Sequence, residues 1–282
     1  MNIKLTLKSS ILRLIDGLAD TFVGEYFYPL FALAVMHRVR TVAGPSGLKF
    51  HVPNPVNKYR ANTFLTKEPE TLEWLDRIPG GSVVWDIGAN VGLYTCYAAA
   101  VRKCRVFAFE PSVLNLELLA RNIHANDLSS TVTIVPLPIS DQLSFSTLNM
   151  SSMELGGAKS TFKEKYGHDG LPMDALLKVP TIGLSMVEMV ELLKIPQPDF
   201  IKMDVDGIEH LILGAGGAVL RGAREVLVEI NDDFHEQAEL ARKYLHDAGF
   251  KLLEKRHAAE FDDCGTAAAT TFNQIWAKAE HA

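Results

Sequence analysis

The fold class is decided by one stretch of sequence, which reads Val83-Val84-Trp85-Asp86-Ile87-Gly88-Ala89-Asn90-Val91-Gly92. The short apolar run predicts a buried strand, and the glycines let the backbone turn tightly before a helix begins. Gly88 has no Cβ and allows a ligand to approach the backbone, while Gly92 lets the helix pack near the strand. Free N–H groups at the helix start favour an anionic or polar ligand. The stretch therefore predicts the first strand–turn–helix unit of a ligand-binding sheet.

Acidic residues also follow the next two predicted strands. Glu110 ends the second strand and lies 18 residues after Gly92, the spacing typical of an acid that binds both hydroxyls of a ribose. Ser140 and Asp141 follow the third strand, where a carboxylate can accept a hydrogen bond from an adenine amino group. Together with Asp86, these acids indicate a nucleoside site. The structural alternative is that Asp86 caps a helix and Glu110 is a surface residue.

The glycine turn distinguishes between two classes of cofactor. A dinucleotide site reads G-x-G-x-x-G, whereas this turn lacks the third glycine. Asp86 stands two residues before Gly88, where a carboxylate repels a pyrophosphate but accepts a hydrogen bond from the ammonium of an amino-acid tail. The turn therefore favours S-adenosylmethionine over NAD. Two alternatives stay open: an NAD-dependent oxidoreductase, and a non-catalytic protein that binds S-adenosylmethionine.

Apolar runs and helical segments alternate from residue 83 onward, which predicts a parallel sheet with helices on both faces. We expect strands at residues 83–86, 105–109, 132–135, 200–203, 225–230, 250–254 and 271–277. We expect helices at residues 68–76, 92–101, 113–126, 208–220 and 234–248. Prolines between residues 44 and 62 predict loops and short strands there.

Two segments lie outside this pattern. Residues 142–198 are expected to form a lid that faces the substrate, with disorder or a spacer as the alternative. Residues 1–44 predict a helical appendage, whose most apolar run has 15 residues where a membrane-spanning helix takes about 20. We favour an appendage that packs on the main domain; the alternative is a peripheral helix on a membrane surface. The protein is expected in the cytoplasm, either free or associated with a membrane.

The composition excludes several classes of protein. Apolar residues make up 48% and charged residues 22% of the chain, as in a globular protein rather than a disordered or collagen-like one. The net charge of −6 argues against nucleic acid as the main partner, because phosphate binding needs a basic face. Cys96, Cys104 and Cys264 form no C-x-x-C pair, which disfavours a zinc site or a disulfide framework.

The glycine turn is one of four motifs; the others are Thr66-Lys67-Glu68-Pro69-Glu70-Thr71, Phe109-Glu110-Pro111 and Ile201-Lys202-Met203-Asp204-Val205-Asp206-Gly207-Ile208-Glu209. With these motifs the chain resembles the FkbM family of S-adenosylmethionine-dependent methyltransferases over about residues 47–250. The resemblance implies an α/β, class I methyltransferase (Rossmann-like) fold. Its doubly wound, seven-stranded sheet would be mostly parallel with the last strand antiparallel. The methyltransferase domain would span residues 45–282, with the helical N-terminal appendage at residues 1–44 and the insertion at residues 142–198.

The resemblance also implies roles for individual residues. The methionine part of the cofactor would be bound by Asp86, Gly88, Ala89, Asn90 and Gly92. Glu110, with Pro111 beside it, would hold the ribose, and Ser140 and Asp141 would flank the adenine. Arg60, Lys67 and Glu68 belong to a segment that lies near the cofactor in the family. Family members O-methylate small-molecule or glycan-linked hydroxyls, and the appendage resembles that of bacterial members near glycan clusters, which implies a sugar hydroxyl in a glycan or glycolipid as acceptor.

Charged residues follow the fourth strand, at the edge where an acceptor would meet the methyl group. Lys202 and Asp204 share strand parity, and so does Asp206 if the strand continues that far. In one mechanism Asp204 is a general base, with Lys202 orienting it or the acceptor. In a second, Asp204 or Asp206 joins Glu229 and Asn231 around Mg²⁺, which lowers the pKa of the acceptor hydroxyl. The structural alternative is that Asp206 caps the next helix while Lys202 pairs with a carboxylate.

Overall fold

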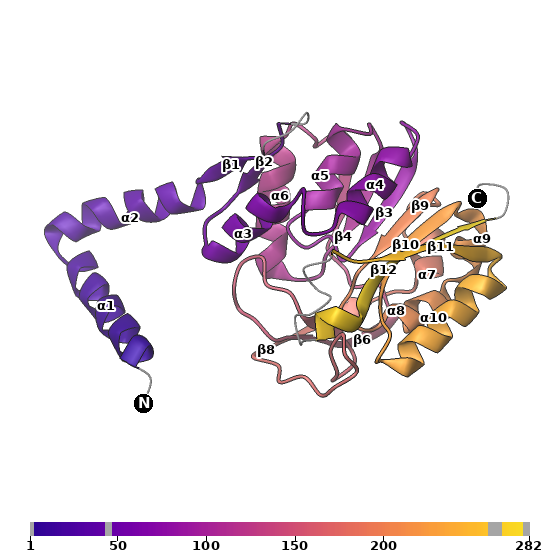
Figure 1. The fold of residues 1–282 in the computed structure, drawn as a ribbon. Helices are drawn as coiled ribbons and strands as arrows, with labels where there is room; N and C mark the ends of the chain where they lie inside the picture. Colours follow the sequence, from indigo (N-terminus) through magenta and orange to yellow (C-terminus); the bar gives the residue numbers. More distant parts are fainter. Residues whose placement is uncertain (1–2, 43–46, 259–266, 279–282) are drawn as a thin grey trace.

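The computed structural model describes residues 3–42, 47–258 and 267–278 of the 282-residue chain. Its centre is a seven-stranded sheet in the order β11-β12-β10-β9-β3-β4-β5 (Figure 1). The strands are β3 (Val83–Ile87), β4 (Arg105–Phe109), β5 (Val132–Val135), β9 (Phe200–Met203), β10 (Glu225–Asn231), β11 (Phe250–Arg256) and β12 (Thr271–Lys278). β12 runs antiparallel to β10 and β11, whereas the pairs among β10, β9, β3, β4 and β5 are parallel. The expected Rossmann-like, class I methyltransferase fold is confirmed.

Helices cover both faces of this sheet, as two-sided burial of the strands requires. Trp85 and Ile87 of β3 pack into one core with α7 (Met186–Glu191), α8 (Glu209–Ala215), α9 (Gly217–Gly222) and α10 (His235–Asp247). Val84 packs into a second core with α3 (Pro55–Thr63), α4 (Pro69–Arg77), α5 (Leu93–Ala100) and α6 (Val113–Ala125). Successive residues of β3 thus point into opposite cores, which explains why the strand reads as a continuous apolar run.

The two glycines of the turn after β3 are required by close packing within the protein. Gly88 has a φ of +85°, and a Cβ there would lie 1.8 Å from the carbonyl oxygen of Asp204. Gly92 has a φ of +81°, and a Cβ there would lie 2.4 Å from Cδ1 of Leu119. We expected Gly92 to let its helix pack near the strand. The structure shows instead that Gly92 makes room for α6. Gly88 brings the end of β3 against the loop after β9.

The N-terminal residues depart from the sequence-based expectation. α1 (Ile3–Ala19) and α2 (Phe22–Met36) form an arm that extends away from the sheet (Figure 1). α2 buries none of its residues, so the prediction that the appendage packs on the main domain is wrong. β1 (Val39–Thr41) pairs with β2 (Lys49–His51), so the appendage is not helical throughout. The predicted boundary at residue 44 lies outside the described residues, as does Cys264.

Among the helices of the described residues, none is both long enough and apolar enough to cross a bilayer.

The long insertion forms its own small sheet. β6 (Ser144–Met150), β7 (Ser160–Phe162) and β8 (Leu177–Gly183) pair antiparallel in the order β7-β6-β8. The segment is therefore folded, and its irregular sequence reflects short strands joined by long loops. α3 lies where we expected only loops and short strands. Asn54 accepts a hydrogen bond from the backbone N–H of Asn57, and Pro55 occupies the first helical turn, a start signal that the prolines around it obscured.

Candidate active site

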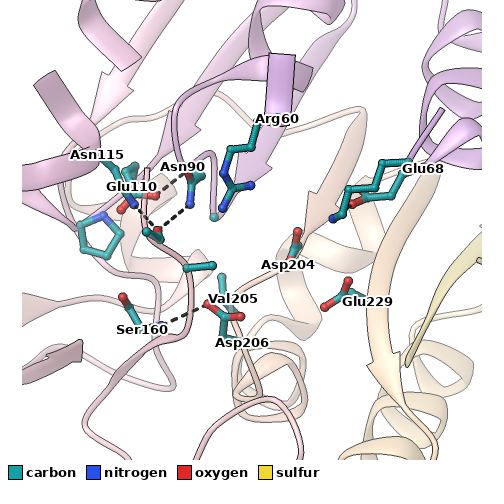
Figure 2. A pocket seen from close by; sticks show the side chains of 15 residues that line it. Arg60, Glu68, Asn90, Glu110, Asn115, Ser160, Asp204, Val205, Asp206 and Glu229 are labelled. Atoms are coloured by element: carbon teal, nitrogen blue, oxygen red, sulfur yellow. Dashed lines mark hydrogen bonds and ion pairs between the residues drawn. The ribbon is translucent and has the colours of Figure 1, made fainter. Parts of the chain in front are cut away.

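The main cavity lies where β3, β4 and β9 end and beside β10. Its empty volume, which includes space open to solvent, is about 820 Å³. It is lined by Arg60, Lys67, Glu68, Gly88, Asn90, Glu110, Pro111, Asn115, Gly157, Ala158, Ser160, Asp204, Val205, Asp206 and Glu229. Figure 2 shows Glu110 and Asn90 on one side, Glu68 and Glu229 on the other, and Asp204 between them. Ala89 lines an adjoining pocket that shares Gly88 and Asn90 with the main cavity.

Glu110 is held by backbone donors at the mouth of the glycine turn. The backbone N–H of Asn90 donates to Oε2 at 2.8 Å, and the N–H of Ser112 donates to Oε1 at 2.7 Å. Burial raises the pKa of Glu110 to about 7, although these two hydrogen bonds act in the opposite direction. The carboxylate is thus oriented by the protein and titrates near neutral pH.

Asn90 links the glycine turn to the insertion. It adopts a φ of 49°, and its Nδ2 donates to the carbonyl oxygen of Gly157 at 2.9 Å. Asn115 donates to the same carbonyl at 3.2 Å. The Oδ1 atom of Asn90 is buried and accepts no hydrogen bond from any residue that the structure describes. A buried amide oxygen in a cavity wall needs a donor, which a cationic ligand can supply.

Lys202 forms the centre of a buried charge network. Its Nζ lies 3.4 Å from Oδ2 of Asp204 and 3.7 Å from Oδ1 of Asp86, and only 3% of the residue is exposed. Burial opposes the charge of Lys202, but the carboxylates around it, Asp204 first, raise its pKa above the ordinary value. Thr95 donates to Oδ2 of Asp86 at 2.5 Å. Asp86 therefore faces Lys202 and Thr95, and it does not line the main cavity.

The strand does not continue to Asp206, so the condition for its shared parity with Lys202 is not met, and Asp204 also lies just after the strand. β9 ends at Met203, and Asp206 has a φ of 62° in the turn that follows. Its Oδ2 accepts hydrogen bonds from the backbone N–H groups of Lys159 at 2.7 Å and Ser160 at 3.1 Å. Burial, and next the charge of Asp204, raises its pKa. Asp206 thus fastens the insertion over the cavity.

Glu209 positions the same turn from the start of α8. Its Oε1 accepts from the N–H of Val205 at 2.9 Å, and its Oε2 accepts from the N–H of Gly207 at 3.0 Å. Gln237 donates to Oε2 as well. Burial raises the pKa of Glu209 to about 7. We had noted this residue in the fourth motif without assigning it a role.

The predicted metal ligands are not brought together. Asp204 and Glu229 line the main cavity, but Asn231 does not. Oδ1 of Asn231 accepts from the N–H of Asp233 and from Oγ1 of Thr270, each at 3.0 Å. Within residues 3–42, 47–258 and 267–278, no group of three or more His, Cys, Asp or Glu side chains is arranged to hold a metal ion. The hypothesis of a magnesium site therefore lacks support, because the amide oxygen of Asn231 already accepts hydrogen bonds from Asp233 and Thr270.

The predicted adenine residues also lie apart from the main cavity. Ser140 donates to Asp141 at 2.9 Å, and Nζ of Lys163 lies 3.0 Å from Oδ2 of Asp141. Burial opposes the charge of Asp141, but the hydrogen bonds from Lys163 and Ser140 together with the charge of Lys163 lower the pKa. An apolar pocket lies beside the main cavity, and Gly88 and Pro111 line both of them. Neither Ser140 nor Asp141 lines the main cavity or this apolar pocket. Asp141 instead pairs with a lysine of the insertion.

A second cavity adjoins the first on the side of Lys67 and Glu68. Its empty volume is about 580 Å³, and it is lined by Lys67, Glu68, Glu70, His168, Glu229, His257, Ala268, Thr271 and Asn273. Nζ of Lys67 lies 2.6 Å from Oε1 of Glu68, and the Tyr94 hydroxyl donates to Oε2 at 2.9 Å. Burial opposes the charge of Glu68, but Lys67 outweighs it and lowers the pKa. Lys67, Glu68 and Glu229 therefore form the wall that both cavities share.

Several residues of the two cavities were missed from the sequence. Asn115, Gly157 and Ser160 reach the main cavity, and His168 and Asn273 reach the second. They stand in different elements, far apart along the chain and outside the motifs. The four motifs locate the ends of the strands, but they do not show which loops fold over them.

Comparison with known proteins identifies the family. Residues 86–252, more than half of the chain, match the family described as the Methyltransferase FkbM domain. The chain belongs to the FkbM methyltransferase family. The match runs from within β3 to within β11, and it includes every lining residue of the main cavity except Arg60, Lys67 and Glu68.

A characterised relative and two solved structures are similar to this FkbM chain. Hexuronic acid methyltransferase AglP of Haloferax volcanii is 28% identical over 157 residues, which span 56% of this chain and 59% of that protein. The M. jannaschii tRNA m1G37 methyltransferase has a TM-score of 0.46 at 14% identity, covering 85% of this chain and 56% of its own. M. capricolum TrmK in complex with S-adenosyl-homocysteine has a TM-score of 0.44 at 12% identity, covering 74% and 67%.

Proposed function

We propose that this FkbM protein transfers the methyl group of S-adenosylmethionine to a hydroxyl of a sugar in a glycan or glycolipid. The observation that carries the proposal is the row of acceptor groups in the main cavity, from Glu110 through Asn90 to Asp204 and Glu229. The relative that is named a hexuronic acid methyltransferase supports a sugar as the substrate class.

The main cavity suits S-adenosylmethionine. The oriented carboxylate of Glu110 accepts hydrogen bonds from ribose hydroxyls. The buried Oδ1 of Asn90, which accepts no hydrogen bond within the described part of the chain, is available to an ammonium group. The acid-rich lining favours a cofactor with a sulfonium charge.

Asp204 is the proposed general base. When bound, S-adenosylmethionine supplies an electrophilic methyl group to the acceptor oxygen. Asp204 accepts the proton of the acceptor hydroxyl, and Lys202 holds the Asp204 carboxylate in place through the ion pair at 3.4 Å. Asp206 is proposed as a positioning residue, because its carboxylate is occupied by two backbone N–H groups of the insertion.

The test is a methyl-transfer assay with isotope-labelled S-adenosylmethionine and a panel of sugars, sugar nucleotides and glycolipids, read by mass spectrometry. The expected result is a labelled methyl ether on one acceptor class. Binding of S-adenosylhomocysteine without transfer to any acceptor supports the non-catalytic alternative. Binding of NADH but not of S-adenosylhomocysteine in calorimetry would refute the proposal.

The N-terminal arm is proposed as a peripheral membrane contact that brings the protein to a glycolipid acceptor. Phe22 is 91% exposed and Phe31 is 68% exposed, on a helix with no buried residue. Arg38 and Arg40 follow directly and suit anionic lipid headgroups. Co-sedimentation with phosphatidylglycerol vesicles should be lost in the double variant Phe22→Ser, Phe31→Ser. The exposed Val113 of α6 provides the control Val113→Ser, and equal sedimentation of both variants would contradict the assignment.

A further inference from the structure

The second cavity is assembled from segments that the family motifs leave unassigned. Lys67 and Glu68 come from the turn before α4, His168 from the insertion, His257 from the end of β11 and Asn273 from β12. Because it shares Lys67, Glu68 and Glu229 with the main cavity, a ligand in it would lie next to the methyl donor. In Figure 2 this shared wall is on the side of Asp204 that faces away from Glu110.

Glu70 gives this cavity a buried polar group that a ligand can bind. Only 1% of the residue is exposed, and Nδ2 of Asn273 donates to its Oε1 at 2.7 Å. Its other carboxylate oxygen, Oε2, is buried and accepts no hydrogen bond among the described residues. A buried carboxylate oxygen in a cavity lining calls for a donor, and a ligand hydroxyl supplies one.

The charges of the lining favour an uncharged ligand. The ammonium of Lys67 is committed to Glu68 at 2.6 Å, so that these two charges cancel within the wall. Burial raises the pKa of Glu229 well above the ordinary value, with the charge of Asp204 next in effect, so this wall disfavours a further anion. Among the described lining residues no arginine or second lysine is present to neutralise a ligand carboxylate beside Glu70.

The insertion is held in the position that completes the cavity. Gly207 has a φ of +119°, and a Cβ there would lie 2.5 Å from the carbonyl oxygen of Gly167 and 3.1 Å from Cα of His168. The loop after β9 therefore packs directly against the backbone that carries His168. The loop after β9, which carries Asp204 and Asp206, is thus in direct contact with the wall of the second cavity.

We propose that the second cavity is the acceptor subsite and that it binds an uncharged, hydroxyl-rich sugar ring in preference to a sugar that carries a carboxylate. The inference rests on the proposed function and deepens it. A ring hydroxyl that passes the shared wall enters the main cavity beside Asp204. The sugar specificity then differs from the hexuronic acid in the name of the H. volcanii relative.

The experiment is saturation-transfer NMR on the full chain saturated with S-adenosylhomocysteine. The probes are the neutral methyl glycosides of glucose, galactose, mannose and rhamnose, each run against methyl glucopyranosiduronate. Neutral probes should bind more tightly than the uronate. Glu70→Gln should weaken their binding about tenfold, because a charge-assisted hydrogen bond is lost, while the affinity for S-adenosylhomocysteine stays unchanged.

Glu73→Gln is the matched control, because it makes the same substitution on the exposed side of α4, where Glu73 pairs with Arg256. His168→Ala is a second test variant in a half-buried loop, in case the buried Glu70 variant folds poorly. Three results would overturn the subsite. They are tighter binding of the uronate than of the neutral probes, equal binding of the probes by the wild type and both test variants, and the absence of a saturation-transfer signal for every neutral probe. If S-adenosylhomocysteine fails to bind at all, the proposed function fails instead.

Discussion

The two cavities on either side of the shared wall are built in different ways. The main cavity is formed by short turns at the ends of β3, β4 and β9, where backbone N–H groups hold Glu110, and by Gly157, Ala158 and Ser160 of the insertion. The second cavity is formed by side chains from the insertion and from the C-terminal strands. A cofactor that is common to a family can be bound by a fixed set of strand ends. An acceptor that differs between members is better bound by variable loops.

The largest expected effect is on turnover and comes from Asp204, which lines the main cavity beside the shared wall. Asp204→Asn removes the base but keeps the shape of the side chain, so kcat should fall about 10²- to 10⁴-fold. The affinity for S-adenosylhomocysteine, measured by calorimetry, should stay within about threefold. Glu73→Gln, on the exposed side of α4, is the control. Full activity of Asp204→Asn would remove this residue from the mechanism and leave Glu229 as the carboxyl group between the cavities.

The next effect is on stability and tests how rigid the main cavity is. Gly88→Ala places a Cβ against the carbonyl oxygen of Asp204, at 1.8 Å before relaxation. The strained φ and the backbone clash together should cost about 2–4 kcal/mol of unfolding free energy in urea titrations. Gly81→Ala is a matched control, because Gly81 has the same φ of +85° and nothing within 4 Å. Its cost should be about 1 kcal/mol, and equal losses would mean that close approach to β9 is unimportant.

The third prediction concerns the pH dependence of cofactor binding. Burial raises the pKa of Glu110 to about 7, and ribose hydroxyls donate to the ionised form. Binding therefore lowers this pKa and releases a proton. The affinity for S-adenosylhomocysteine should rise by up to about tenfold per pH unit below pH 7 and level off above it.

Calorimetry in buffers of different ionisation enthalpy measures this proton release directly. Glu110→Gln should bind more weakly and remove the pH dependence. A pH dependence that persists in Glu110→Gln would assign the proton to another carboxyl group of the main cavity, Asp206 or Glu229, whose pKa values are also raised by burial.

The smallest expected effect lies at the ion pair between Lys163 and Asp141, on the side of the insertion. Both side chains are about one-third exposed, so the pair should contribute less than about 1 kcal/mol. Lys163→Met should lower the melting temperature only slightly and leave the affinity for S-adenosylhomocysteine nearly unchanged. A large loss of affinity would indicate that Lys163 positions Asp141 for the adenine, as the family resemblance implies.

Local sequence patterns were sufficient for most of the sheet. The predicted strands at residues 105–109, 132–135 and 200–203 agree with β4, β5 and β9. The spacing of Glu110 behind the glycine turn predicted a carboxylate at the cavity, and one is there. These predictions succeed because a buried parallel strand must be apolar along its whole length and because its end must carry the polar groups.

The expectations that the structure changed involve contacts between distant parts of the chain. Parity would have placed Asp206 beside Lys202 only if the strand continued, but β9 ends at Met203 and a turn with a φ of 62° directs Asp206 to the insertion. Asp86, which we expected at the cofactor, does not line the main cavity, and its Oδ1 lies 3.7 Å from Nζ of the buried Lys202. In both cases the deciding partner is more than 40 residues away, and no local pattern marks it.

The sequence by itself determined the family, the strands of the central sheet with the helices between them, and the acids at the strand ends, because these depend on burial patterns and on motifs within short segments. The tertiary structure alone decided which acids reach the cavity, that the N-terminal helices leave the domain, and that a second cavity with the buried Glu70 adjoins the first. A cavity is a property of several elements that meet in space. Its lining depends on how segments up to 203 residues apart in the sequence pack together, as Glu70 of α4 and Asn273 of β12 do.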